Sequence, residues 1–309
     1  MKKKPFVSFV IYVNNNQNIV ENFINKLDKF SSSYFENYEY VFVDDNSADN
    51  TTVKITEKVP QINVPITLIK LAWHQGSEIA INAGNDIAIG DFVFEVDNIN
   101  TDYPIDTYSR LYENMEKGFD IVAASPKTST QNTSKIFYKI LNKVSYLKLD
   151  LTTETLRLVS RRAINSIVKL NEKLRYRKAL YHYSGFPRSV IYYESEKSTN
   201  RNKTSIWSKI DLAINIILNF SNIGGNIAII LSFIFLLFSM GAGLYAILIF
   251  IIDKKVIEGW TTIMLLLSFG FTGLFFILGI IGKYISILLL EIKNRPLYTV
   301  KSVQRLSNN

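Results

Sequence analysis

Acidic residues stand directly after two apolar, β-branched runs of this sequence. Asp44 and Asp45 follow the run VFV, and Asp97 follows FVFEV, with Asp102 five residues further along the chain. An apolar run that ends in acids is typical of a buried strand that carries carboxylates to the edge of a sheet. Open α/β sheets bind ligands at that edge. Carboxylates there could accept hydrogen bonds from a nucleotide base or ribose and hold a divalent metal ion.

These acids also have a plainer interpretation, as turn formers and helix caps. Asp49, just ahead of a predicted helix, fits a cap as well as it fits a ligand. Asp44, Asp45 and Asp97 fit a cap less well, because acids beside buried strand ends need partners. Glu95 and Asp97 point to the same face of their predicted strand and could therefore act as a pair.

Alternating strands and helices must position these acids. The predicted strands are Phe6–Val13, Tyr40–Asp44, Ile66–Leu71, Phe92–Asp97 and Asp120–Ala124. The predicted helices are Ile19–Phe30, Thr51–Val59, Ser77–Ile89 and Ile105–Lys117. Repeated βα units imply a mostly parallel sheet with helices on both faces. After about Thr128 the pattern becomes irregular.

Several classes of site are excluded or disfavoured. No GxGxxG follows the first strand and no GxxxxGK[ST] occurs, which disfavours a dinucleotide fold and a P-loop. The chain has no cysteine, so disulfides and thiolate chemistry are excluded and a reducing compartment fits. His74 and His182 are far apart in sequence, which gives little support to a metal pair or a Ser-His-Asp triad.

The second half of the chain is unusually apolar. Residues 212–252 and 259–282 contain no charged side chain, and each run exceeds the roughly 20 residues that cross a bilayer. We therefore predict transmembrane helices over Ile227–Ile252 and Trp260–Leu290, preceded by an amphipathic interfacial helix within residues 206–225. Core helices of a soluble bundle are the alternative, but such helices show a polar face.

Charge predicts the orientation. The loop at 253–259 is nearly neutral, whereas the tail at 291–309 carries Lys293, Arg295, Lys301 and Arg305, so both ends are expected in the cytoplasm. The net charge of +8 fits attraction to anionic lipid headgroups and needs no nucleic acid. The expected organisation is thus a domain at 1–205, the interfacial helix, membrane helices at 226–290 and a basic tail. Gly270, Gly273, Gly279 and Gly282 could let membrane helices associate into a homo-oligomer.

Four segments, spread along nearly the whole chain, resemble a known family. VDDNSADNT matches VDDxSxDxT, HQGSEIAINAGNDIAIGDF matches NxGxxxAxxxGxxxAxGD, LRLVSRR matches FRLxSRR, and GKYISILLLEIKNRPLY matches the end of a second membrane helix and its tail. On these motifs the chain is similar to the GT-A-type, family-two glycosyltransferases. It resembles in particular their polyprenyl-phosphate branch, with dolichyl-phosphate mannose synthase and the undecaprenyl-phosphate glucosyltransferases.

The resemblance implies a Rossmann-like GT-A domain anchored to a bacterial-type inner membrane. The reaction would be inverting transfer of a sugar from a nucleotide diphosphate sugar to a polyprenyl phosphate, in cell-surface glycan biosynthesis. Asp45 would accept from the base N–H with support from Asp44, and Asp97 would bridge Mg²⁺ or Mn²⁺ to the diphosphate. The full donor set would be Tyr12, Asn15, Asp44, Asp45, Gly76 and Asp97.

The chain departs from the family at its metal motif. The DxD reads Asp97, Asn98, Ile99, so the second acid is an isoleucine. Glu95 could replace it as a metal ligand beside Asp97, or could instead support the ligand from behind. Asp102 from the following loop is another candidate for metal binding or catalysis.

The acceptor site also differs. Where the family has a candidate base, this chain has Thr155, with Glu154 one place earlier. A hydroxyl acceptor would need Glu154 as base, whereas a lipid phosphate is already anionic. Basic side chains suited to phosphate pairing, or to a basic face on lipid headgroups, are Arg157, Arg161, Arg162, Arg201 and Lys203. A nucleotide-binding scaffold that has lost catalysis is the third alternative.

Overall fold

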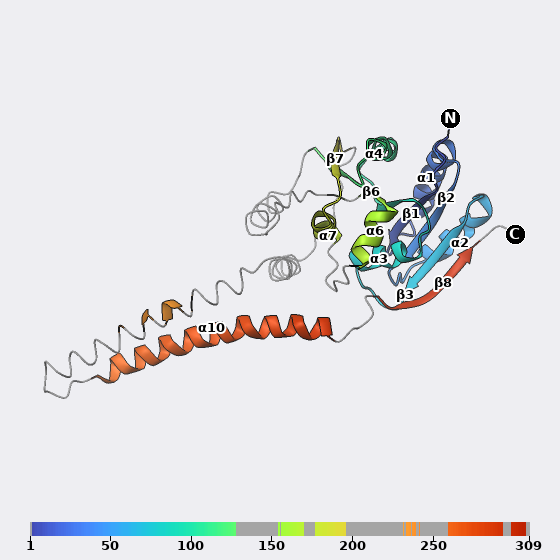
Figure 1. Cartoon of the computed structure of the whole chain (residues 1–309). Coiled ribbons are helices and arrows are strands. Elements are labelled where there is room, and N and C mark those ends of the chain that lie inside the picture. The colour runs from blue at the N-terminus through green and yellow to red at the C-terminus, as the bar shows by residue number, and fades with distance from the viewer. Residues whose placement is uncertain are drawn as a thin grey trace. The chain divides into compact units, whose positions relative to one another are not determined.

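The computed structural model describes residues 2–127, 154, 156–169, 177–195, parts of 231–241, 259–292 and 298–306. The chain forms two compact units. The first comprises Met1–Asn142, Leu147–Lys203 and Pro296–Asn309, and the second comprises Lys143–Tyr146 and Thr204–Arg295. Figure 1 shows the sheet of the first unit and the long helix α10 of the second.

The first unit is built on one mixed sheet. Over the described residues its strands lie in the order β7-β5-β6-β4-β1-β2-β3-β8. The strands are β1 (Val7–Val13), β2 (Tyr38–Asp44), β3 (Ile66–Leu71), β4 (Phe92–Val96), β5 (Ile121–Pro126), β6 (Leu156–Ser160), β7 (Arg188–Tyr193) and β8 (Val300–Leu306). The pairs β1–β2, β1–β4, β2–β3 and β5–β7 are parallel, whereas β6 and β8 run antiparallel to their neighbours.

Helices connect and cover these strands (Figure 1). They are α1 (Val20–Tyr34), α2 (Thr51–Lys58), the 3₁₀ turn η1 (Val59–Gln61), α3 (Ser77–Ile87), α4 (Thr107–Glu116), α6 (Arg161–Lys169) and α7 (Arg177–Tyr183). Helix α1 buries residues at helical spacing, including Phe23, Ile24 and Leu27. All seven residues of β2 are buried, as expected of a central parallel strand that is covered on both faces. The predicted α/β fold and its alternating elements up to residue 126 are thus confirmed.

Gly84 lets helix α3 lie directly on the sheet. A Cβ at this position would stand 2.2 Å from Val10 Cγ1 and 3.0 Å from Val43 Cγ2, well inside contact distance. The absence of a side chain therefore sets how closely α3 approaches β1 and β2. This packing matters for the site, because the loop ahead of α3 carries Gly76.

Three strands were not predicted. Strands β6 and β7 come from the stretch after Thr128 that shows no clear period, and β8 comes from the segment expected to be a basic tail. Strand β8 pairs with β3 from Ile66↔Leu306 to Leu71↔Val300, so the end of the chain completes one edge of the sheet. The segment expected to be a basic tail thus contains a strand that its own pattern does not predict.

Helix α10 (Trp260–Ile292) forms where a helix was predicted over Trp260–Leu290. Counted over the described residues alone, none of the helices combines the length and the apolar character required to cross a bilayer. The predicted interfacial helix at 206–225, most of the predicted helix at 227–252 and the domain boundary at 205 lie outside the described residues.

Candidate active site

The two acidic strand ends meet at one edge of the sheet. Strands β2 and β4 flank β1 in parallel, with Val13 opposite Asp44 and Ile11 opposite Val96. The carboxyl ends of these three strands therefore lie together, and Asp44, Asp45 and Asp97 follow from them. This is the convergence that the sequence predicts.

Asp45 is completely buried and organises the loop at residues 72–76. Its Oδ1 accepts from the backbone N–H of Gln75 at 2.7 Å, and its Oδ2 accepts from the backbone N–H of Gly76 at 2.8 Å. The Tyr12 hydroxyl donates to Oδ2 at 3.2 Å, and His74 Nδ1 lies 2.9 Å from the same oxygen. Burial and the neighbouring Asp45 raise the pKa of Tyr12, so Tyr12 stays a neutral donor.

Gly76 ends this loop in a backbone conformation that favours glycine. Its φ of +89° lies in a region that residues with a side chain rarely adopt, and helix α3 begins directly after it. The predicted contact of Gly76 with a donor stays a prediction, but its conformation explains why the loop can point two successive N–H groups at one carboxylate.

Asp44 and Asn15 hold the loops at the same edge. Both carboxylate oxygens of Asp44 accept from the Ser47 N–H, at 3.3 and 3.4 Å, and burial raises the pKa of Asp44. Asn15, at a φ of 51°, accepts from the Ala48 N–H at 2.9 Å and donates its own N–H to Ser47 Oγ at 3.0 Å. The loops after β1 and β2 are thus tied into one wall.

Asp49 stands one residue before Asn50, the N-cap of α2, and bonds to the first residue of this helix. Its Oδ1 accepts from the Thr51 N–H at 3.0 Å at the start of α2, and its Oδ2 accepts from the Gln17 N–H at 3.0 Å. Burial alone would raise the pKa of Asp49, but the hydrogen bonds from Thr51 and Gln17 hold it below its ordinary value.

A buried network of charges surrounds Asp97. We call it the carboxylate–arginine cluster, and its members are Glu78, Glu95, Asp97, Glu154, Arg157 and Arg177. Arg157 donates to Glu95 at 2.9 Å, to Asp97 at 3.0 Å and to Glu154 at 3.0 Å. Arg177 donates to Glu95 at 2.7 Å, to Asp97 at 2.6 Å and to Glu78 at 3.1 Å. Each arginine side chain is only 1% exposed.

The arginines stay charged despite their burial. Burial disfavours a charged guanidinium, but Asp97, Glu154 and Glu95 raise the pKa of Arg157 well above its ordinary value. Asp97, Glu78 and Glu95 likewise raise the pKa of Arg177. Both arginines hold Asp97, one through each carboxylate oxygen, so the orientation of this carboxylate is fixed.

Glu95 supports the arginines rather than facing solvent. Its side chain is fully buried, and its Oε2 accepts from both guanidiniums. Its Oε1 accepts from Asn85 Nδ2 at 2.6 Å and from the Tyr181 hydroxyl. Because the Glu95 side chain is fully buried whereas that of Asp97 keeps 13% exposure, the geometry favours the interpretation in which Glu95 holds Asp97 from behind over the one in which it binds the metal ion.

The cluster bears on metal binding through its charge. No group of three or more His, Cys, Asp or Glu side chains that could hold a metal ion occurs among the described residues. Mg²⁺, however, is commonly held by one or two carboxylates together with substrate phosphates. Four carboxylates share two guanidiniums here, which leaves an excess of negative charge, and the Asp97 side chain keeps 13% exposure. Asp97 therefore fits a cation that the diphosphate also coordinates.

The other two acids predicted to be catalytic, Asp102 and Glu154, are both buried and bonded to other side chains. Asp102 is buried and accepts from the Tyr193 hydroxyl at 3.0 Å and from Ser195 Oγ at 3.2 Å, at the end of β7. Ile99, in place of the second motif acid, packs in the core at 3% exposure. Glu154 is 6% exposed and pairs with Arg157.

The structure separates the arginines predicted to bind the acceptor phosphate. Arg157 faces the carboxylates of the cluster. Arg161 and Arg162 begin α6 at the far end of β6, where Ser160 pairs with Phe92, so they lie at the opposite edge of the sheet from Asp97. Arg161 and Arg162 therefore do not lie beside Asp97, and the phosphate-binding role predicted for them stays a prediction. Arg201 and Lys203 lie outside the described residues.

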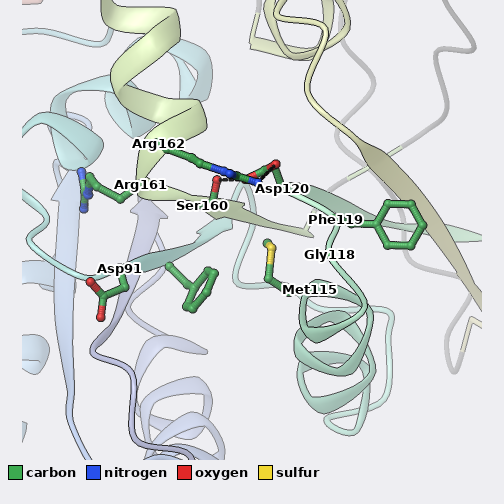
Figure 2. A pocket seen from close by; sticks show the side chains of 9 residues that line it. Asp91, Met115, Gly118, Phe119, Asp120, Ser160, Arg161 and Arg162 are labelled. Atoms are coloured by element: carbon green, nitrogen blue, oxygen red, sulfur yellow. Dashed lines mark hydrogen bonds and ion pairs between the residues drawn. The ribbon is translucent and has the colours of Figure 1, made fainter.

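A cavity of about 320 Å³ accompanies Arg161 and Arg162 at that opposite edge. Figure 2 shows Arg162 extending to Asp120, which it holds through two hydrogen bonds of 2.5 Å, whereas Arg161 points away from Asp120. Arg161 donates to the carbonyl oxygens of Gly90 at 3.0 Å and Asn85 at 3.2 Å. Both side chains thus fasten the end of β6 to neighbouring elements.

Sequence reasoning missed Arg177 and Tyr181. Both lie on α7, within the stretch whose pattern is irregular. A signal was present, because Arg177 precedes Leu180 and Tyr181 by three and four residues, and all three are buried on one helix face. A charged residue on an apolar face requires a buried partner, and Glu95 and Asp97 provide it.

The site and fold together define a class of protein: an open α/β sheet whose strand ends present acids to a nucleotide-type ligand. Residues 8–178 match the family model for glycosyl transferase family 2. The chain belongs to this family and is a glycosyltransferase, as its resemblance to the family-two enzymes predicts.

Relatives match over almost the full length. An uncharacterised glycosyltransferase of Synechocystis is 28% identical over 304 residues, covering 96% of this chain and 95% of that protein. A bactoprenol glucosyl transferase of Shigella phage SfII is 26% identical over 306 residues, covering 97% and 98%.

Solved structures share the fold. Glucosyl-3-phosphoglycerate synthase from Mycobacterium tuberculosis, in complex with Mn²⁺, uridine diphosphate and glucosyl-3-phosphoglycerate, superposes with a TM-score of 0.53. The sequence identity is 13%, over 71% of this chain and 80% of that one. The Rossmann-like GT-A fold expected from the sequence is therefore confirmed.

Proposed function

We propose that this chain transfers a sugar, with inversion, from a nucleotide diphosphate sugar to a polyprenyl phosphate in cell-surface glycan biosynthesis. The observation that carries the proposal is the pairing of two acidic groups at one sheet edge. Asp44 is the last residue of β2 and Asp45 directly follows it, and Asp97 stands in the carboxylate–arginine cluster after β4. One group suits a nucleoside and the other a diphosphate with its cation.

The donor would bind along this edge. Asp45 is buried and already engages the N–H groups of Gln75 and Gly76, so a base N–H would take the place of the exposed His74 at an acceptor that the loop holds in place. Tyr12 and Asn15 line the same wall and would contact the nucleoside. When bound, Mg²⁺ or Mn²⁺ would be held by Asp97 and would offset the charge on the leaving diphosphate. The two arginines would keep Asp97 in the orientation that this requires.

The state of Glu154 favours a phosphate acceptor over a hydroxyl. Its Oε2 accepts from Arg157 at 3.0 Å, and its side chain is 5% exposed, so it is committed to an ion pair. A hydroxyl acceptor would have to lose a proton to such a base as it attacks. A phosphate oxygen carries its own charge. It attacks the anomeric carbon, the bond to the diphosphate oxygen breaks, and the nucleotide diphosphate leaves with the electron pair.

The comparisons support the same acceptor. The phage and prophage relatives are named bactoprenol glucosyl transferases, and the match extends over nearly the whole chain at 26% identity. The acceptor we propose is therefore a polyprenyl phosphate.

We further propose that α10 anchors the protein in a bacterial-type inner membrane, with both termini in the cytoplasm. Large apolar side chains along α10 are exposed, among them Ile263 at 58%, Phe269 at 61% and Phe276 at 57%. Exposed apolar surface of this extent is typical of contact with lipid or with another apolar helix. The lysines and arginines near the end of the chain support the proposed orientation.

Transfer with purified full-length protein tests the proposal. Radiolabelled nucleotide sugars are incubated with undecaprenyl phosphate or with a lipid-linked saccharide in detergent micelles. We expect label in the polyprenyl-phosphate product, and none with Asp97→Asn. Label that appears only with the saccharide would establish the hydroxyl acceptor instead. Donor binding without transfer to either acceptor would support the nucleotide-binding scaffold.

A further inference from the structure

Residues 72–76 are held from two sides. On one side, Asp45 accepts from the backbone N–H groups of Gln75 and Gly76. On the other side, the loop contacts Thr299, just before β8. The Ala72 N–H donates to the Thr299 carbonyl oxygen at 2.9 Å, and the Gln75 side chain bonds to the same residue.

The Gln75 carboxamide pairs with Thr299 in both directions. Its Nε2 donates to the Thr299 carbonyl oxygen at 3.0 Å, and its Oε1 accepts from the Thr299 N–H at 3.1 Å. A carboxamide offers a donor and an acceptor, as a peptide group does. The side chain therefore continues the β3–β8 ladder beyond its last backbone pair, Leu71↔Val300, where the register is already irregular.

Gln75 thus contacts both Asp45 and the segment that precedes β8. Its backbone N–H fixes Asp45, and its side chain fixes the residue before β8. A second contact, from the Tyr298 hydroxyl to Asp86 Oδ2 at 2.8 Å, fastens the same segment to α3. The loop that shapes Asp45 is therefore supported by residues more than two hundred positions away in the sequence.

We propose that Gln75 is a positioning residue for donor binding, and that strand β8 acts through it to hold residues 72–76 against Asp45. The proposal rests on the proposed function, in which Asp45 receives the nucleoside. Strand β8 follows α10 in the chain, so the segment behind the proposed membrane helix completes the donor site. The site is then incomplete in a chain that lacks its last residues.

The test compares Gln75→Met with Gln304→Met in the full-length protein. Both variants replace a carboxamide by a thioether of similar length, and Gln304 is an exposed residue of β8 itself. Gln75→Met removes both bonds to Thr299, whereas Gln75→Glu keeps the acceptor for the Thr299 N–H and loses the donor. The two measurements are amide hydrogen exchange at Gln75 and Gly76 without any donor, and calorimetric titration with nucleotide sugars.

Each neutral hydrogen bond contributes enough to change an equilibrium severalfold, so losing two predicts amide exchange at Gln75 and Gly76 about tenfold faster. Donor affinity in the calorimetric titration should fall by about tenfold. In the transfer assay the same variant should show a higher KM with little change in kcat. Gln75→Glu should lie between wild type and Gln75→Met in both measurements. Gln304→Met should match wild type.

Two results separate the failure of this inference from the failure of the proposed function. If Gln75→Met exchanges and binds as Gln304→Met does, the positioning role is overturned while the proposed function stands. If the wild-type chain binds no nucleotide sugar, the proposed function fails. The positioning role of Gln75 towards a donor then falls with it, even where the exchange rates differ as expected.

Discussion

Replacing Arg177 by methionine removes one guanidinium from the carboxylate–arginine cluster and leaves an apolar side chain of comparable length. Arg177 is 1% exposed and pairs with Glu95 at 2.7 Å, with Asp97 at 2.6 Å and with Glu78 at 3.1 Å. The substitution leaves Glu95 fully buried with one guanidinium fewer, and it also removes one partner of Asp97. Removing one partner of a buried ion pair strands the charge of the other.

The expected loss follows from that burial. Breaking a buried pair costs about 3–5 kcal/mol. The contact with Glu78 adds little, because the Glu78 side chain is 31% exposed and water screens it. For a chain of this size the loss corresponds to a fall in melting temperature of about 6–20 °C. Circular dichroism of the full-length protein in detergent measures this fall.

Lys127→Met provides the control. Lys127 pairs with Glu194 at 2.9 Å, and the two side chains are 58% and 82% exposed. Water screens that pair, so this variant should melt close to wild type. The reasoning is refuted if Arg177→Met melts within about 2 °C of Lys127→Met, since burial would then add nothing to the ion pair.

Three further changes test the packing, the loops and the cation. Gly84→Ala should destabilise the protein by about 1–3 kcal/mol, because its Cβ would stand 2.2 Å from a side chain of β1. Gly279→Ala is the control, since its Cβ would meet nothing within 4 Å. Thermal melting should show a lower melting temperature for Gly84→Ala alone. Folding lowers the pKa of Asp49, so its stabilising effect should be present above pH 3.8 and be lost as the pH falls through the folded value. In urea titrations at a series of acidic pH values, Asp49→Asn should therefore lose less stability on acidification than wild type. An equal loss in both proteins would contradict the stabilising role of the Asp49 carboxylate. Chelation of divalent metal ions by EDTA should weaken donor binding, measured by calorimetry, at least about tenfold, and added Mn²⁺ should restore it. An affinity that chelation does not change would show that donor binding needs no metal ion.

The parts of the fold that local pattern determines could be predicted from the sequence. Apolar runs and helical periods give β1 to β5 and α1 to α4, because each of these elements is buried in a way that its own residues reveal. Convergence of Asp44 and Asp97 follows from parallel strands whose carboxyl ends share an edge. No long-range information was needed for either inference.

The parts that depend on distant pairing could not be predicted. Strand β6 inserts antiparallel between β4 and β5, and this places Arg157 opposite Glu95 on the neighbouring strand. Nothing in the short segment LRLVS reveals that neighbour. Strand β8 alternates only weakly and carries basic residues, so its own residues predict only a basic tail. Its pairing with β3 is what makes it a strand.

The altered metal motif follows from the same arrangement. Ile99 is buried in the core, so the loop after β4 presents a single motif acid, Asp97, to the ligand edge. The acid that seemed able to compensate, Glu95, is instead the anchor for two arginines that each hold one oxygen of Asp97. A lone carboxylate in a fixed orientation can still coordinate a cation that the donor diphosphate also binds, since Mg²⁺ accepts one protein carboxylate with substrate oxygens completing its shell. An isoleucine at the second motif position is therefore compatible with the proposed cation, which would have Asp97 as its single motif ligand.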